Sequence, residues 1–244
     1  MTAARKQAGS SATYEVYQHL RDEVLASTLR PGAQLNISEL SVRLGVSNGA
    51  VREALSRLSA ESLVIAEPQR GFRVAPVSAV ELRDLTAVRV EVEGMCLRRA
   101  IARGDKEWEA AIVAAFHILS GLPERDDADP ARLNPEWAHA HQAFHFALVS
   151  SCGSPWLLNL REMLFRQSER YRQLSSPPAG TQRDGLAEHL QIMQATVTRS
   201  ADLAASLMSA HLLMTMQIIV GKGLASEQAD AKPTPAHLAL RAMG

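Results

Sequence analysis

Apolar residues recur with helical spacing through most of the chain, and Gly- and Pro-containing stretches interrupt them. This pattern predicts a mainly α-helical protein. One stretch, 63–75, departs from it, with two short apolar runs around a turn at 67–71, which predicts a small β-hairpin. Pro76 follows the hairpin and everything after Ser78 is helical in period, so the chain divides into two parts.

The N-terminal part contains three helical segments before the hairpin. The first covers about 14–29 and is followed by two shorter helices, 39–44 and 47–60. Ser38 and Ser47 precede these as expected N-caps. Two short helices joined by a glycine-containing turn form a helix-turn-helix, and the hairpin behind them is typical of the wing of a winged helix.

Six helical segments follow Ser78, and they predict an antiparallel all-α bundle. Their approximate bounds are 79–103, 105–121, 130–152, 154–174, 181–198 and 200–222. The expected domains are a disordered tail (1–11), a winged helix-turn-helix domain (12–77), a helical domain (78–225) and a mobile tail (226–244).

Composition limits the partners and the compartment. The formal net charge is zero, so DNA contact must depend on a few local arginines and not on a global basic field. Cys96 and Cys152 are isolated in apolar helical patterns, which is typical of reduced core residues. No apolar run approaches membrane-spanning length and no signal-peptide region is evident, so we expect a cytoplasmic protein without a membrane partner.

Polar residues at the start of the second short helix are candidates for reading DNA. Arginine can pair bidentately with guanine and asparagine with adenine, and a helix N-terminus suits a phosphate. Arginines on the hairpin can reach a phosphate or the minor groove. An ordinary winged domain with solvated arginines is the alternative. The candidate residues are Ser47, Asn48, Gly49, Arg52, Arg70 and Arg73.

Four histidines in the C-terminal part are candidate metal ligands. His141 and His145 lie one helical turn apart, so both imidazoles share one face of their helix. His189 and His211 lie on two later helices, and a bundle can bring all four to one interior point. A single helical histidine is more often a core or surface residue, and we assign no role to His19, His117, His139 and His237.

Three stretches in residues 14–76 resemble the winged helix of the GntR family. They are Leu29-Arg30-Pro31-Gly32, the run Ser-Asn-Gly-Ala-Val-Arg-Glu-Ala-Leu at 47–55, and Gly71-Phe72-Arg73-Val74. The family often has Arg where this chain has Asn48 and Pro where it has Ala50, so its usual operator sequence does not transfer. The resemblance implies a regulator that binds double-stranded operator DNA as a homodimer.

Residues 78–222 resemble the effector domain of the FadR branch of that family. Its metal-binding members use Asp-x-x-x-His, then Glu-His, then a histidine in the last helix; His145, Glu188-His189 and His211 match. His141 stands at the Asp position, and an imidazole in place of a carboxylate favours Zn or Ni over Mn or Mg. The resemblance implies a divalent metal with open positions for a small carboxylate effector.

Arg89 matches the arginine near the pocket of this branch, which implies that it binds the effector carboxylate. An ion pair with Glu93, one turn later, is the alternative. The stretches 103–110, 141–145, 152–154 and 169–172 resemble the glutarate-responsive CsiR-type repressors of the branch. A repressor that responds to a short dicarboxylate such as glutarate is therefore expected.

Two other functions remain open. One is a metal-sensing regulator whose metal is structural and which binds no organic effector. The other is a metal-dependent hydrolase, because His-x-x-x-His is similar to the zincin helix. Gln142 stands where that helix has its catalytic glutamate, however, and an amide cannot take a proton from a metal-bound water. We therefore expect a protein that is not an enzyme.

Overall fold

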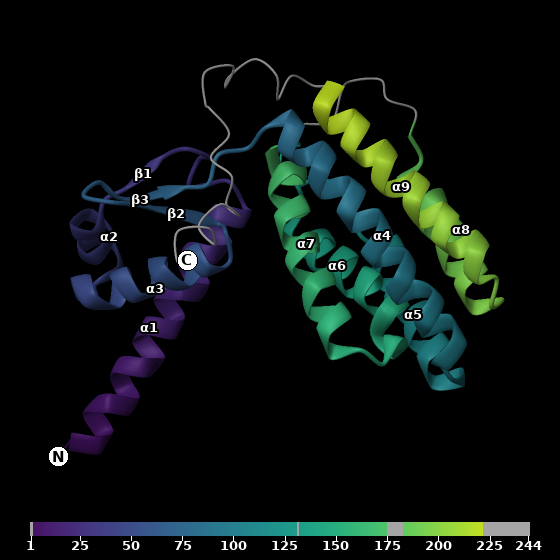
Figure 1. Cartoon of the computed structure of the whole chain (residues 1–244), viewed down its shortest axis with the longest axis horizontal. Coiled ribbons are helices and arrows are strands. Elements are labelled where there is room, and N and C mark those ends of the chain that lie inside the picture. The colour runs from purple at the N-terminus through teal and green to yellow at the C-terminus, as the bar shows by residue number, and fades with distance from the viewer. Residues whose placement is uncertain (1, 131, 175–182, 222–244) are drawn as a thin grey trace, which may run out of the picture. The chain divides into compact units, whose positions relative to one another are not determined.

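A computed structural model of the chain describes residues 2–130, 132–174 and 183–221. The chain divides between Ser78 and Ala79 into two compact units, which are described separately (Figure 1). The expected mobile tail, 226–244, and the expected helix break at 175–180 lie outside the described residues.

The first unit is a winged helix-turn-helix. Ser47 caps α3 as expected, accepting a hydrogen bond from the Ala50 amide at 3.2 Å. The N-cap of α2 is Asn36 and not Ser38, because the Asn36 side chain accepts bonds from two free amides of the first turn. The helices are α1 (Thr2–Leu25), α2 (Ile37–Leu44) and α3 (Asn48–Ala60).

The sheet of this unit has three strands, one more than the predicted hairpin. The order is β1-β3-β2, with both pairs antiparallel. The added strand places Leu35 opposite Phe72 in the register, and both side chains are buried. Two residues are too short a run to show a strand period, so sequence patterning could not find β1. The strands are β1 (Gln34–Leu35), β2 (Val64–Glu67) and β3 (Gly71–Val74).

The first helix differs from its expected bounds at both ends. It begins at Thr2, so residues 2–11 are helical where we expected a disordered tail. This segment is rich in Ala and also holds Arg, Lys and Gln, all of which favour helix, and it contains no proline. The helix ends at Leu25 and not near Leu29, because Ser27 adopts a left-handed backbone with φ of 57°.

The second unit is the predicted helical bundle, and all six expected segments are present. The largest change of bounds is in α6, which begins at Pro135, five residues later than expected, because Asn134 caps it. Cys96 and Cys152 are free and buried in the core. The helices are α4 (Ala79–Arg103), α5 (Lys106–Ser120), α6 (Pro135–Val149), α7 (Pro155–Leu174), α8 (Gly185–Val197) and α9 (Ala201–Gly221), with a short 3₁₀ helix, η1, at Ser150–Cys152.

The first and last helices of the bundle, α4 and α9, lie side by side (Figure 1). α9 has one charged residue, Asp202, and is long and apolar enough to cross a membrane by length and composition. A core helix of a soluble protein meets the same criteria, so this is weak evidence for a membrane span. Its buried residues, including Met208 and Leu212, contribute to the core of the bundle.

Candidate metal centre and DNA-binding surface

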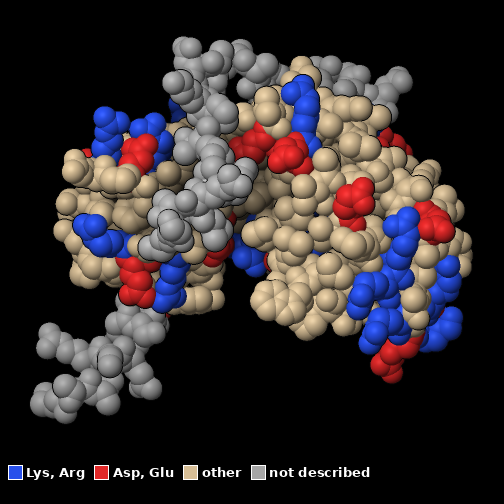
Figure 2. Space-filling view, viewed as in Figure 1, with Lys and Arg blue, Asp and Glu red and all other residues tan. Residues whose placement is uncertain are grey.

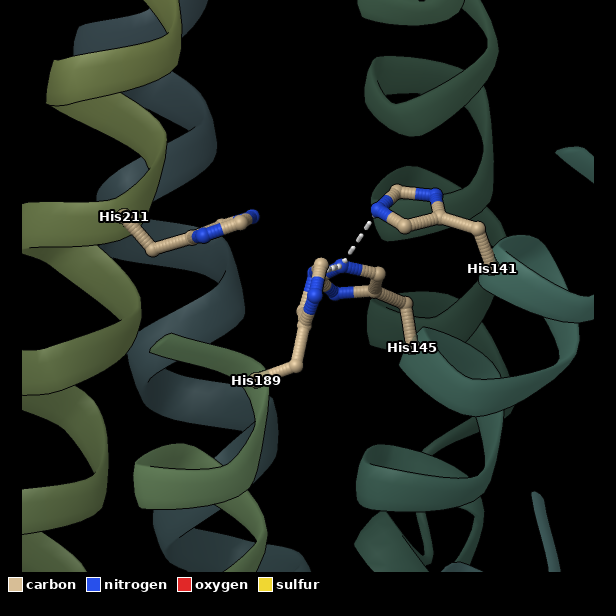
Figure 3. A group of neighbouring side chains, drawn as sticks. All are labelled: His141, His145, His189 and His211. Carbon is tan, nitrogen blue, oxygen red and sulfur yellow. Dashed lines mark hydrogen bonds between the residues drawn. The ribbon is translucent and has the colours of Figure 1, made fainter. Parts of the chain in front are cut away.

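The four predicted histidines meet in the interior of the bundle (Figure 3). His141 and His145 come from α6, His189 from α8 and His211 from α9. One ring nitrogen of each lies within 4.8 Å of the others, and all four side chains are buried. The Nε2 atoms of His141 and His145 are 3.0 Å apart, and those of His145 and His189 are 3.3 Å apart. Convergent, buried imidazole nitrogens are suited to a divalent transition metal.

Burial makes these imidazoles neutral at ordinary pH. It lowers the pKa of His141, His145 and His189 well below the usual value, and nearby cationic groups lower it further. Burial also lowers the pKa of His211 to about 4, although the hydrogen bond with Glu188 opposes this. A metal binds the neutral imidazole, so the four rings are ready to bind without losing a proton.

Glu188 fixes the orientation of His211. Its Oε2 lies 2.8 Å from Nδ1 of His211, which leaves Nε2 of that ring without a hydrogen-bond partner. Arg183 donates to both carboxylate oxygens, at 2.8 and 2.6 Å. Burial would raise the pKa of Glu188, but hydrogen bonds with Arg183 and His211 outweigh it and hold the pKa at about 2. The carboxylate therefore accepts the Nδ1 proton and directs the Nε2 lone pair to the cluster, as outer partners of metal-bound histidines do.

Aromatic packing holds the rings on α6. Trp137 stacks on His141 with 4.7 Å between ring centroids, and Phe165 lies 6.0 Å from His145. The Nδ1 atoms of His141 and His145 have no hydrogen-bond partner, so no hydrogen bond at Nδ1 orients these rings, and aromatic packing holds that side of each. The intervening Gln142 donates to Glu162 of α7 at 3.2 Å. Its amide therefore binds α7, on the outside of the bundle, and takes no part in the cluster.

Arg89 adopts the ion pair that was the alternative to effector binding. Its Nε lies 3.4 Å from Oε1 of Glu93, and Arg161 Nε approaches the same oxygen at 3.0 Å. The guanidinium groups of Arg89 and Arg161 lie 4.9 and 4.7 Å from the ring of Phe165. Burial lowers the pKa of Arg89. One carboxylate is thus shared by two buried guanidinium groups, and the second oxygen of Glu93 has no hydrogen-bond partner.

Arg89 also lines a cavity between α4, α7 and α9. A second arginine, Arg172, lines it too, and its guanidinium lies 5.4 Å from the ring of Trp137, which stacks on His141. Arg172 belongs to the stretch 169–172, which resembles CsiR-type repressors, but the sequence predicted no role for it. The remaining lining residues are Leu82, Thr86, Ser168, Glu169, Leu212, Thr215, Met216 and Ile219. The cavity therefore combines apolar walls with two arginines and one glutamate, Glu169, which pairs with Arg172.

The candidate DNA-binding residues lie at two places in the winged unit. Asn48, Gly49 and Arg52 are exposed in the first turns of α3, after the cap Ser47. Arg70 is exposed in the β2–β3 turn. On β3, Arg73 is half-buried and pairs with Glu67, with its Nε 3.1 Å from Oε1, so this guanidinium is tied to the wing itself. Figure 2 shows both basic and acidic side chains on the side of the winged unit that it presents, so that side does not carry a single sign of charge.

A winged helix-turn-helix joined to a helical bundle with a buried histidine cluster defines a class of transcriptional regulators that sense a ligand with a second domain. Comparison with protein families agrees with this. Residues 12–74 match the bacterial regulatory proteins of the gntR family, and residues 84–213 match the FCD domain. The chain belongs to the GntR family and carries an FCD domain. Members of this family bind operator DNA through the first domain and an effector through the second.

Curated relatives span nearly the whole chain. The regulator BphR of Paraburkholderia xenovorans is 38% identical over 85% of this chain and 85% of its own length. The transcriptional repressor GlaR of Escherichia coli is 39% identical over 83% of this chain and 93% of its own length. Both relatives are HTH-type transcriptional regulators, which is the expected class.

Solved structures show the same fold. A GntR regulator from Rhodococcus sp. RHA1 superposes with a TM-score of 0.69 at 25% identity, covering 86% of this chain and 98% of its own. McbR/YncC of E. coli gives a TM-score of 0.69 at 20% identity, covering 86% and 97%. The predicted fold class, a winged helix-turn-helix followed by a helical bundle, is confirmed.

Proposed function

We propose that this protein is a homodimeric, cytoplasmic repressor whose operator binding is modulated by a small carboxylate at a metal held by four histidines. The observation that carries the proposal is the convergence of four buried, neutral imidazoles in the bundle. The same bundle has a cavity lined by two arginines. The similarity to the repressor GlaR supports the sign of regulation. A short dicarboxylate such as glutarate is the proposed effector class.

His141, His145, His189 and His211 would hold the metal, which supplies a Lewis-acid site for carboxylate oxygens. An all-nitrogen ligand set favours Zn or Ni. Four protein ligands are the usual number for a structural zinc ion, whereas a metal that takes more than four ligands would also accept effector oxygens. The choice between a structural metal without an organic effector and a metal that binds the effector therefore depends on which metal is present.

The two arginines of the cavity would hold the carboxylates. Arg89 is engaged with Glu93 at 3.4 Å, longer than a normal charge-assisted hydrogen bond, so it can turn toward an anion at small cost. Arg172 pairs with Glu169 at 3.3 Å and also lines the cavity. Apolar walls between the charged groups suit a short methylene chain.

Calorimetric titration of glutarate and related acids tests the effector. We expect binding to metal-loaded protein, weaker binding to metal-stripped protein, and weaker binding to Arg89→Ala protein that keeps its metal. Arg98→Ala, an exposed arginine of the same helix, is the control and should bind like wild type. Equal binding to the loaded and stripped forms would remove the metal from the effector site. Operator affinity that changes with the metal alone would support the metal-sensing alternative.

Operator binding has its own test. Arg52 on α3 is proposed to read a base, so Arg52→Ala should cost roughly 1–3 kcal/mol and relax sequence preference. Arg70 and Arg73 are proposed to contact phosphate, and each Ala variant should weaken specific and non-specific DNA equally. We expect the larger effect from Arg70, because Arg73 is paired with Glu67. An unchanged ratio of specific to non-specific affinity in Arg52→Ala would contradict the assigned role of α3.

A further inference from the structure

One carboxylate oxygen in the core of the bundle accepts hydrogen bonds from two arginines. The Oε1 atom of Glu93 on α4 lies 3.0 Å from Nε of Arg161 on α7. It also lies 3.4 Å from both Nε and Nη2 of Arg89, one turn earlier on α4. The other carboxylate oxygen, Oε2, is buried and has no hydrogen-bond partner. All three side chains are at most 5% exposed, so bulk water cannot correct this uneven use of the two oxygens.

Arg161 forms only half of the pair that its guanidinium can make with Glu93. In a guanidinium, Nε–H and the neighbouring Nη2–H point in parallel and match the two oxygens of one carboxylate. Arg161 uses its Nε, whereas its Nη2 is buried and has no hydrogen-bond partner. An unsatisfied donor and an unsatisfied acceptor thus belong to two side chains that already touch. A small turn of the Glu93 carboxylate joins them and completes a bidentate pair.

Arg89 is weakly held by comparison. Both of its contacts with Glu93 are longer than the range of about 2.7–3.2 Å for an N–H···O hydrogen bond, and both use the oxygen that Arg161 already contacts. Burial lowers the pKa of Arg89, Glu93 opposes this, and Arg161 lowers the pKa further. Arg89 also lines the cavity between α4, α7 and α9, whereas the described lining residues include neither Glu93 nor Arg161.

We propose that Glu93 and Arg161 act as a release for Arg89, an inference that rests on the carboxylate effector of the proposed function. When an effector carboxylate binds Arg89, this guanidinium leaves Oε1, and the Glu93 carboxylate turns to accept from both Nε and Nη2 of Arg161. A long ion pair within α4 is exchanged for a bidentate pair between α4 and α7. The effector therefore leaves no carboxylate unpaired in the core. Glu93 and Arg161 are positioning residues, which act on the effector only through Arg89.

Calorimetric titration of glutarate into metal-loaded protein tests the release. Arg161→Lys keeps the charge and can still contact Oε1, but an ammonium group cannot form the bidentate pair. The variant should raise the glutarate dissociation constant at least ~10-fold, the value of one charge-assisted hydrogen bond, and should keep its metal. Arg166→Lys is the matched control, because Arg166 lies on the same helix and pairs with Glu162 through Nε at 2.8 Å. It should bind glutarate like wild type.

A double-mutant cycle separates this positioning role from a merely structural one. In Arg89→Ala protein no arginine remains to be released, so adding Arg161→Lys should not weaken glutarate binding further. Circular dichroism should show equal helix content in all variants. An equal loss from Arg161→Lys in the wild-type and Arg89→Ala backgrounds would overturn the release and leave the effector site intact. Wild-type affinity in Arg161→Lys protein would do the same.

Nitrogen-15 NMR of the arginine side chains follows the exchange in wild type. The Nη2 signal of Arg161, assigned by its loss in Arg161→Lys protein, should shift when glutarate is added, because this nitrogen gains a hydrogen bond. The signals of Arg166 should stay unchanged. An unshifted Arg161 signal in glutarate-saturated protein would overturn the release alone. Metal-loaded protein that binds no short dicarboxylate would overturn both the release and the effector of the proposed function.

Discussion

Glu188 determines which nitrogen of His211 is available to a metal. The carboxylate accepts the Nδ1 proton at 2.8 Å, so Nε2 carries the lone pair. Glu188→Gln can donate its amide N–H to Nδ1, which favours the tautomer of His211 with the proton on Nε2. We expect metal affinity to fall 10- to 100-fold, the usual effect of losing such a partner, with little loss of helix content. Competition with a chromogenic chelator measures this.

The control for that variant is Asp202→Asn, which removes a carboxylate at the start of α9. Asp202 is exposed and pairs with Arg98 at 2.9 Å, away from the cluster. Metal affinity should remain that of wild type. If both variants lose the same affinity, a general electrostatic effect and not the hydrogen bond of Glu188 is responsible.

Glu93 compensates two buried cations, and its removal should be costly. Arg89 and Arg161 both pair with this carboxylate inside the bundle. Glu93→Ala leaves the buried guanidinium of Arg89 without its ion-pair partner and that of Arg161 with Glu162 alone, at 3.5 Å, so we expect about 3–5 kcal/mol less free energy of unfolding in urea. Glu107→Ala, an exposed residue of the first turn of α5, should cost less than about 1 kcal/mol. Similar losses from the two variants would mean that solvent already screens Arg89 and Arg161.

At the scale of elements, the turn between α4 and α5 depends on a glycine. The indole of Trp108 lies against Gly104, where a Cβ would overlap the ring, and its Nε1 donates to the carbonyl of Ala147 on α6 at 2.8 Å. Gly104→Ala must displace the indole and should cost about 1–3 kcal/mol, measured by thermal unfolding. At Gly121, which ends α5, the nearest atom to an added Cβ is 3.7 Å away. Gly121→Ala should be nearly neutral, and an equal cost at both positions would contradict this.

The elements that sequence patterning found are those with several turns of apolar period. All six bundle helices and α3 belong to this group, since each repeats its apolar stripe often enough to be seen. The strand β1 was missed because two residues carry no period. The N-cap of α2 was misassigned because Asn36 and Ser38 are both good caps, and only the structure shows whose side chain meets the free amides.

The candidate site was predictable to a similar extent. His141 and His145 were identified by their i, i+4 spacing, and His189 and His211 by their match to the metal-binding pattern of the family. The ion pair of Arg89 with Glu93 was correctly named as an alternative, since i and i+4 side chains meet on a helix. The contribution of Arg172 and the bond of Glu188 to His211 depend on contacts between helices that are 23 or more residues apart in sequence. No local pattern reports such contacts.

At the scale of the whole molecule, the histidine cluster links stability to pH. The pKa of His211 is lowered from 6.5 to about 4, so between these values the unfolded chain takes up a proton and the folded chain does not. The free energy of unfolding of metal-stripped protein is therefore highest above pH 6.5 and falls as pH drops toward 4, by about 3 kcal/mol for this group. The free energy of unfolding of His211→Asn, measured in urea at several pH values, should depend less on pH than that of wild type. An equal dependence on pH in the two proteins would contradict this account.

Metal removal should lower stability without unfolding the bundle. The bundle has a core that contains no metal ligand, including Cys96, Ile112 and Leu148. Metal at 100 times its dissociation constant adds about 2.7 kcal/mol by mass action. Chelation should therefore lower the melting temperature and leave the far-ultraviolet signal unchanged at 25 °C. Loss of that signal at this temperature would show that the fold requires the metal.

The pairing of α4 with α9 has a consequence for how the protein is made. These helices are the first and last of the bundle, and about 100 residues separate them along the chain. At synthesis rates of 5–20 residues per second, α4 waits about 5–20 s for its main neighbour. His211 also arrives on α9, after the other three histidines of the cluster. The winged unit can fold early on the ribosome, whereas the helical bundle, and with it the histidine cluster, is completed only near the end of translation.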